Sequence, residues 1–463
     1  MRRYLIFVTA GLSLLMYSID ATAVAVAFPH FIRELNTNVL WAGWTVSIFL
    51  VGVTTTMPLA GKLSDTFGRK SVFLTSLALF VVSSLACGLA PNIYALVVCR
   101  FFQGVGGASF LPTASGIVSD HFPENRQSAI GLFTSIFPIG GIIGPNLGAW
   151  IVSRFSWRYI FYINLPIGLG LFALILVLLK DSRTLSRRRV DFQGSFLLSG
   201  SILFLMFGLN VVVNDSGPLS LIFFAAFLLT SVFLSVLFFR HEKKEADPIL
   251  DLALLQSRPF LAANVLNMML GAGFFGLFSF IPLYAVSVHG LSTLMSGMVL
   301  TPRSLWVIVT SVFTSFILKR SGYRRPLVLG LASVSLALIL LAPGLPSWSV
   351  IGGSSGATET LAFLVLILGL GIGITNPAAN NACIELMPKR VATIVGLRGM
   401  FRSVGGVMSI CLITSILHLS SGPVAGFRIT FLSFGFLIAC GIPLAFLVPS
   451  GRQTGSDHDG QMA

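Results

Sequence analysis

The stretch Gly61-Lys-Leu-Ser-Asp65-Thr-Phe-Gly68-Arg69-Lys70 is a short polar segment between two apolar runs, Val39 to Ala60 and Ser71 to Ala90. Each run has about the ~20 residues that a helix needs to cross a bilayer. Segments rich in Lys and Arg lie on the cytoplasmic side of membranes, and this one holds three basic residues and one acid. The stretch therefore predicts a tight turn between two transmembrane helices at the cytoplasmic face.

The composition of the whole chain agrees with this interpretation. Of the 463 residues, 55% are hydrophobic and 10% are charged, which is typical of a polytopic membrane protein. A net charge of +14 in a soluble protein would suggest nucleic acid as a partner. Here most Lys and Arg residues fall in segments assigned to the cytoplasm, as the positive-inside rule describes. The expected partner is therefore the lipid bilayer, and nucleic acid is not expected.

Apolar runs predict an all-α fold with fourteen transmembrane helices. An even number of crossings puts both termini on one side of the membrane, and the basic Arg2-Arg3 pair assigns that side to the cytoplasm. The five cysteines are scattered without metal-ligand spacing, so neither a metal nor a cofactor is expected. The chain has no loop of the form Gly-x-x-x-x-Gly-Lys-Ser/Thr, which argues against ATP-driven transport.

Two basic linkers, residues 180–191 and 240–258, divide the predicted helices into groups of six, two and six. We expect an N-terminal six-helix bundle at residues 1–180, linkers with two inserted helices at 181–258, a C-terminal six-helix bundle at 259–448 and a cytoplasmic tail at 449–463.

A weak internal repeat supports two related halves. One shift along the sequence superposes the pairs Gly104 and Gly369, Gly106 and Gly371, Pro112 and Pro377, Asp120 and Glu385, Phe133 and Arg398, and Phe137 and Arg402. The polar stretch also recurs, as Lys319 to Arg325 with its Gly322 in place of Gly68, but without the acid. Chance matches between glycines are easy in a chain with 46 of them. The matched prolines and acids make a true repeat the better interpretation.

The pattern Gly-x-x-x-Asp-x-x-Gly-Arg-Lys at residues 61–70 resembles the signature loop of the major facilitator superfamily. The resemblance implies two six-helix bundles that give alternating access to a cavity near the membrane midplane. It also implies a transporter of small molecules rather than an enzyme.

A second motif combines Gly131, Gly140, Gly144-Pro145 and Gly148. It resembles the motif that proton-driven exporters of the superfamily carry, with Ala149 in place of the last glycine. Ordinary small-residue packing with a proline kink explains the glycines as well, but it explains the Gly-Pro pair less readily. The resemblance therefore implies export.

Two further segments, Asp20 to Pro29 and Trp157 to Gly168, resemble motifs of the fourteen-helix drug:proton antiporters, and Ala25 replaces an asparagine common in the first. This branch implies a proton-coupled antiporter in the cell membrane that exports hydrophobic or amphipathic small molecules, as in multidrug efflux. We expect it to act as a monomer.

Asp20 is the candidate proton-coupling residue. It is the only acid deep within a predicted helix, where a charged group is costly unless it is paired. At the helical rise, Asp20 lies about 13 Å and Arg100 about 12 Å from the external ends of their helices, so the two side chains can meet. The alternative is a static ion pair that only fixes helix packing.

The second half holds the candidate residues of the substrate cavity: Arg303, Arg398, Arg402, Asn376 and Asn380. Intramembrane charges mark functional sites more often than packing positions. For the asparagines, hydrogen bonds that only hold helices together are an equally good explanation.

Two other functions remain open from the sequence alone. An exporter of a specific anionic amphiphile, such as a lipid or an acidic metabolite, is favoured by four deep arginines against one deep acid. A non-transporting membrane receptor is the alternative from another class, although no ligand-binding loop or appended domain is evident.

Overall fold

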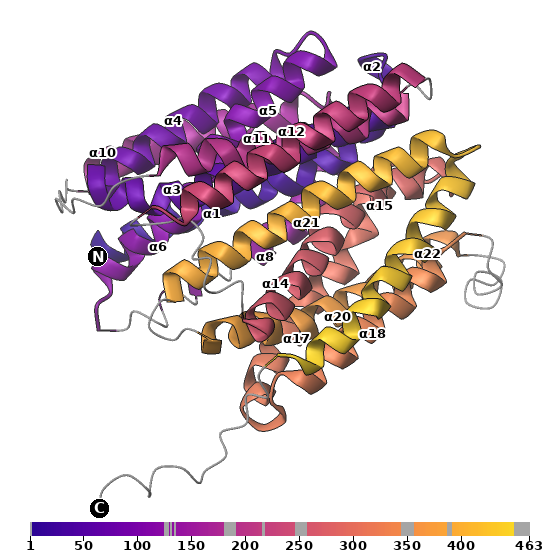
Figure 1. Cartoon of the computed structure of the whole chain (residues 1–463). Coiled ribbons are helices and arrows are strands. Elements are labelled where there is room, and N and C mark those ends of the chain that lie inside the picture. The colour runs from indigo at the N-terminus through magenta and orange to yellow at the C-terminus, as the bar shows by residue number, and fades with distance from the viewer. Residues whose placement is uncertain are drawn as a thin grey trace, which may run out of the picture.

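A computed structural model describes residues 2–124, 129, 132–133, 136–179, 191–214, 218–245, 257–343, 356–386 and 391–448, and these ranges are helical with short turns (Figure 1). Within them, 13 helical segments are long and apolar enough to cross a membrane, and a shorter apolar helix, Phe192–Gly208, adds to them. These segments coincide with the fourteen predicted apolar runs. The predicted all-α membrane fold is confirmed.

The first six crossings are built from α1 (Arg2–Ala23), η1 (Val24–Ala27), α2 (Phe28–Glu34), α3 (Val39–Phe67), α4 (Arg69–Gly88), α5 (Ile93–Gly107), α6 (Phe110–His121), α8 (Ile136–Arg154), α9 (Tyr159–Tyr162) and α10 (Asn164–Leu178). The side chains of Asn38 and Asn92 begin α3 and α5, because each accepts a hydrogen bond from the backbone N–H three residues later.

The remaining crossings are α11 (Phe192–Asn214), α12 (Pro218–Glu242), α14 (Arg258–Gly271), η2 (Ala272–Leu277), α15 (Phe278–Ser287), α16 (Thr293–Met298), α17 (Leu300–Ser321), α18 (Arg324–Leu341), α20 (Ala357–Leu386), α21 (Val391–Leu419), α22 (Pro423–Gly441) and η4 (Ile442–Phe446). The η2 segment is a π-helix that widens the crossing between α14 and α15. Such wide turns occur frequently at functional sites.

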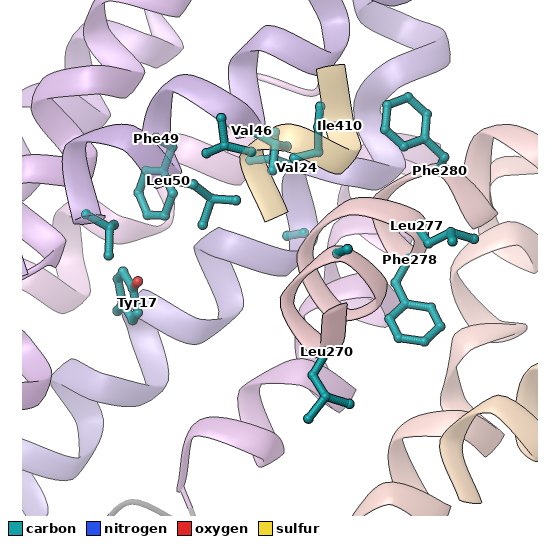
Figure 2. Packing of buried hydrophobic residues seen from close by; sticks show 14 of the residues in the cluster. Tyr17, Val24, Val46, Phe49, Leu50, Leu270, Leu277, Phe278, Phe280 and Ile410 are labelled. Atoms are coloured by element: carbon teal, nitrogen blue, oxygen red, sulfur yellow. The ribbon is translucent and has the colours of Figure 1, made fainter. Parts of the chain in front are cut away.

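Figure 1 shows the elements from α1 to α10 gathered on one side of the molecule and those from α14 to α22 on the other. The groups meet where α3 packs along α21. The inserted helices α11 and α12 pack against each other, and α11 also contacts both α3 and α21. Figure 2 shows the buried core passing between the groups, from Leu50 and Val24 to Ile410 and Phe280.

Close backbone contacts support the predicted repeat. A Cβ atom on Gly104 would collide with the carbonyl oxygen of Phe49, and one on Gly369 would collide with that of Arg303. Gly106 on α5 and Gly371 on α20 approach the backbones of α4 and α18 in the same way. The repeated glycines therefore bring equivalent helices together in the two halves.

The signature segment differs from the predicted turn. α3 continues through Phe67, and Gly68 breaks the helix, with φ at +91°. Glycine adopts this left-handed backbone without a steric penalty. The polarity of residues 61–67 marks where the chain leaves the apolar layer, and the helix itself extends beyond that point.

Candidate transport site

Asp20 lies in a buried polar network inside the first half. Its Oδ2 accepts a hydrogen bond of 2.6 Å from Nη1 of Arg100, and both side chains are fully buried. Its Oδ1 accepts from Nε2 of Gln103 at 2.9 Å and from Nδ2 of Asn164 at 2.8 Å. Ser84 Oγ accepts from both amides. The contact between Asp20 and Arg100 that the sequence allowed is present, and two amides complete it.

Arg100 also makes contacts with groups other than Asp20. Its Nε donates to the carbonyl oxygen of Thr45 at 3.0 Å, its Nη1 also donates to Oε1 of Gln103 at 2.7 Å, and its Cζ lies 4.0 Å from the ring centroid of Phe49. A buried pair of this kind needs such additional bonds to offset the loss of hydration.

Neither Gln103 nor Ser84 was predicted from the sequence, and Asn164 was noted there only within a motif. One signal was available for Gln103: it follows Arg100 by one helical turn and so lies on the same face of α5. Asn164 and Ser84 come from other helices, so only the tertiary fold brings them to Asp20.

Glycines of the second motif allow α8 to pack closely against the helix that carries Asp20. A Cβ atom on Gly144 would collide with Oγ1 of Thr22, and one on Gly140 would collide with the side chain of Ser18. Gly148 meets Ala23 in the same manner. Gly131 lies outside the described residues. The motif therefore controls how closely α1 and α8 approach.

Pro145 lies at the edge of this contact. It faces the second half, because a Cβ atom on Gly297 would lie 2.6 Å from the Pro145 carbonyl oxygen.

In the signature segment, Arg69 forms an ion pair with Asp120 and donates to the carbonyl oxygen of Gly116. Lys70 donates from Nζ to the carbonyl oxygen of Leu176 at 3.0 Å. These bonds tie the start of α4 to α6 and α10. Gly61 and Asp65 lie on α3, and the surroundings of these two residues are outside what the structure describes.

A cavity lies between the two halves, and the space within it, open solvent included, is about 760 Å³. Its first-half wall includes Ala21, Thr22, Ala25, Phe137, Pro138, Gly141 and Pro145, and its second-half wall includes Phe275, Phe278, Ser279, Arg303, Ser304, Asn376 and Arg402. Three of the five residues predicted for a cavity are therefore in its lining. Arg398 and Asn380 are half-buried and are not in that lining.

Aromatic rings and one amide contact the cavity arginines. Cζ of Arg303 lies 3.5 Å from the ring centroid of Phe278, and Cζ of Arg402 lies 5.6 Å from that of Phe275. Nη1 of Arg402 donates to Oδ1 of Asn376 at 3.5 Å. The π-helix η2 and α15 thus supply the rings that face both guanidinium groups.

The two halves touch on one side of this cavity. Phe28 packs edge-on against Phe280 with ring centroids 5.4 Å apart, and Nε2 of His30 lies 3.3 Å from Oγ1 of Thr293. Both contacts lie near helix ends, at the end of the molecule that is opposite to the start of α1. We call that opposite end the far face, and the end where α1 begins the N-terminal face.

The cavity lies on the N-terminal side of these contacts. The first crossing reaches the lining at Ala21 on α1 and Ala25 on η1 before it reaches Phe28 on α2. In the second half, η2 and α15 reach the lining at Phe275 and Phe278 before Phe280. The structure therefore has its halves in contact at the far face, with the cavity between that contact and the N-terminal face.

These features define a class of protein: a polytopic helical transporter with a polar cavity between two repeated halves. The profile of the Major Facilitator Superfamily matches residues 10–410, and the chain belongs to this family. It is 30% identical over 416 residues to Multidrug resistance protein 3 of Bacillus subtilis (strain 168), covering 89% of this chain and 79% of that protein. It is 28% identical over 416 residues to Multidrug transporter protein MdtP of the same organism, covering 89% and 75%.

A solved structure of the peptide transporter POT, a mutant form in complex with sulfate, has the same fold. Its TM-score is 0.69 at 15% identity, and the match covers 96% of this chain and 95% of that one. The chain is thus a transporter and not an enzyme, and its relatives agree with the predicted resemblance to drug antiporters.

Proposed function

We propose that this protein is a proton-coupled exporter, an antiporter of hydrophobic or amphipathic small molecules of the multidrug-efflux type. The observation that carries the proposal is the buried pair of Asp20 and Arg100 on α1 and α5. The names of the relatives and the glycine motif on α8 support outward drug transport. The cell membrane is the proposed location, with the N-terminal face at the cytoplasm and both termini there.

In this scheme, a six-helix bundle at residues 1–180 rocks against a second at 259–448, as in other transporters of this architecture. A single chain suffices, because the cavity is built from both halves of one chain. Contact at the far face then corresponds to a state whose cavity faces the cytoplasm.

Asp20 and Arg100 provide the coupling step. Protonation of Asp20 from outside removes its negative charge and weakens its bond to Arg100. Return to the inward-facing state restores the ion pair and expels the proton to the cytoplasm. The glycine contacts between α1 and α8 transmit this change, because α8 also lines the cavity.

The test is transport in proteoliposomes with an imposed pH gradient, using a panel of cationic, neutral and anionic amphiphiles. The Asp20→Asn variant is expected to lose gradient-driven transport while retaining the fold, since the amide keeps the shape of the side chain. Glu359→Gln, an exposed acid near the start of α20, is the matched control and should transport normally. Undiminished gradient-driven transport by Asp20→Asn would refute the proposal.

A further inference from the structure

The described lining of the transport cavity carries two basic side chains. Its lining contains Arg303 and Arg402, and none of the described lining residues is acidic. Among the described transmembrane helices, the deep acid is Asp20, and it is bonded to Arg100 and two amides. Two like charges beside one cavity repel each other, and an anion that enters the cavity relieves that repulsion.

The described contacts of the two cavity arginines are with neutral groups. Aromatic rings attract a guanidinium group through their negative faces but carry no net charge. The Phe278 ring faces Arg303, and the Phe275 ring and the Asn376 amide contact Arg402. The planar donor geometry of arginine matches a carboxylate better than it matches any neutral group. A carboxylate in the cavity would therefore add a charge-assisted contact to those that the rings and the amide make.

The internal repeat indicates that packing does not require these arginines. The offset that aligns Gly68 with Gly322 also aligns Phe49 with Arg303. The glycine contacts support this alignment, because Gly104 contacts Phe49 and its equivalent Gly369 contacts Arg303. Arg402 likewise falls on Phe137. Phenylalanine thus occupies the equivalent positions in the first half.

The opposite wall of the cavity is mostly apolar, with Thr22 as its polar side chain. α1, η1 and α8 contribute Ala21, Ala25, Phe137 and Pro138 to the lining. Most of the lining is apolar with a few polar side chains, which is the usual make-up of a small-molecule site. A ligand that fits both walls has an apolar body toward the first half and an anionic group toward α17 and α21.

We infer that the protein binds amphiphiles with a carboxylate group, and that Arg303 and Arg402 hold that group in the cavity. The inference rests on the proposed function for its meaning as a transport substrate, and the binding itself needs no proton gradient. Compact aromatic acids and single-chain fatty acids share this chemistry.

The test is binding to the purified full chain in neutral detergent, by isothermal titration. Two probe sets are used: 1-naphthylacetate with its amide, and dodecanoate with its amide. We expect at least one carboxylate to bind tenfold or more tightly than its amide, and the set that shows the difference identifies the type of ligand. Equal affinity of acid and amide in both sets overturns the inference.

Variants locate the effect. Arg303→Gln and Arg402→Gln should each remove most of the preference for the carboxylate while changing amide binding less than twofold. Arg303→Lys keeps the charge and should retain part of the preference. Arg428→Gln, an exposed arginine on α22, is the control and should bind as wild type. A preference that survives both Gln substitutions contradicts the assignment to these residues.

The amide serves as an internal check of folding, because a misfolded variant loses both ligands. The result is also separable from the proposed function. Carboxylate preference with proton-independent transport would refute the coupling scheme alone, and proton-coupled transport with no carboxylate preference would refute this inference alone.

Discussion

The two halves of this transporter make equivalent backbone contacts, but their buried charged side chains are arranged differently. The first half encloses a balanced pair, Asp20 with Arg100, at positions without exposure to solvent. Ser18 contacts Gly140 on α8, and Met268 contacts the equivalent Gly405 on α21, so Ser18 and Met268 occupy equivalent positions in the two halves. The same offset makes Leu270 the equivalent of Asp20. Leu270 is part of the buried hydrophobic core (Figure 2). The second half instead has arginines where the first has phenylalanines.

In our proposals, this difference lets one repeated scaffold support two tasks. A fully buried ion pair is suited to storing and releasing a proton. Cations that line a cavity are suited to attracting a ligand. The signature segments differ in the same sense: Arg69 pairs with Asp120, whereas the equivalent Tyr323 bonds to Glu385.

The largest expected effect comes from breaking the balanced pair. Arg100→Leu leaves the Asp20 carboxylate buried without its partner, which costs about 3–5 kcal/mol of folding stability. Arg303→Phe should be neutral or stabilising, because it restores the residue of the equivalent first-half position. Denaturant unfolding in detergent checks both. If Arg303→Phe destabilised the protein as much as Arg100→Leu, the contrast between the halves would be wrong.

A smaller effect is expected at the glycine contact of α8. Gly144→Ala inserts a methyl group against Thr22 and the backbone of α1, and such overpacking costs about 1–3 kcal/mol. Gly141→Ala is the matched control on the same helix, because a Cβ atom there meets nothing within 4 Å. Thermal unfolding should separate the two variants by several degrees, and equal melting temperatures would contradict the close contact.

The stability of the inserted helices α11 and α12 should depend on pH. Burial raises the pKa of the Asp191 carboxyl, but the hydrogen bond from the Gly194 N–H and the contacts with His241 outweigh this, so the pKa lies below its ordinary value. Such a group contributes stability above its unfolded pKa and loses it as pH falls through the folded value. Asp191→Asn should therefore lower the melting temperature at neutral pH and weaken its decrease in acid. An unchanged profile would exclude Asp191 as a tie between α11 and α12.

The smallest effect is expected at the second signature segment. Tyr323→Arg would place a cation opposite Glu385 and imitate the ion pair of Arg69 and Asp120. An exposed pair of this kind adds about 0.2–1 kcal/mol. The gain should vanish in about 1 M salt, where exposed charges are screened, whereas a gain that persists in salt would point to packing instead.

Much of the fold follows from the sequence, because apolar runs of the length of a bilayer leave few alternatives to helices. The contact between Asp20 and Arg100 followed from matching depths on two helices. The roles of Gln103, Asn164 and Ser84 did not, since their approach depends on how four helices pack.

The cavity was predictable only in part. Arg303 and Arg402 were expected near the midplane, because each lies well inside its predicted helix when residues are counted from opposite faces of the membrane. Both line the cavity. Arg398 lies one helical turn before Arg402 on α21 and is not in the lining. Helical depth alone does not determine which face of a helix a cavity will expose. The end of α3 was misplaced for a related reason, because polarity marks the membrane boundary and not the end of a helix.

The central claim is that Asp20 carries the coupled proton, and substrate-induced proton release from the purified protein tests it most directly. A pH-sensitive dye in weakly buffered detergent solution should report proton release when a transported amphiphile is added to wild type or to Glu359→Gln. Asp20→Asn should bind the amphiphile and release no proton. Proton release from Asp20→Asn equal to that from wild type would contradict the account and leave the buried pair as a packing element.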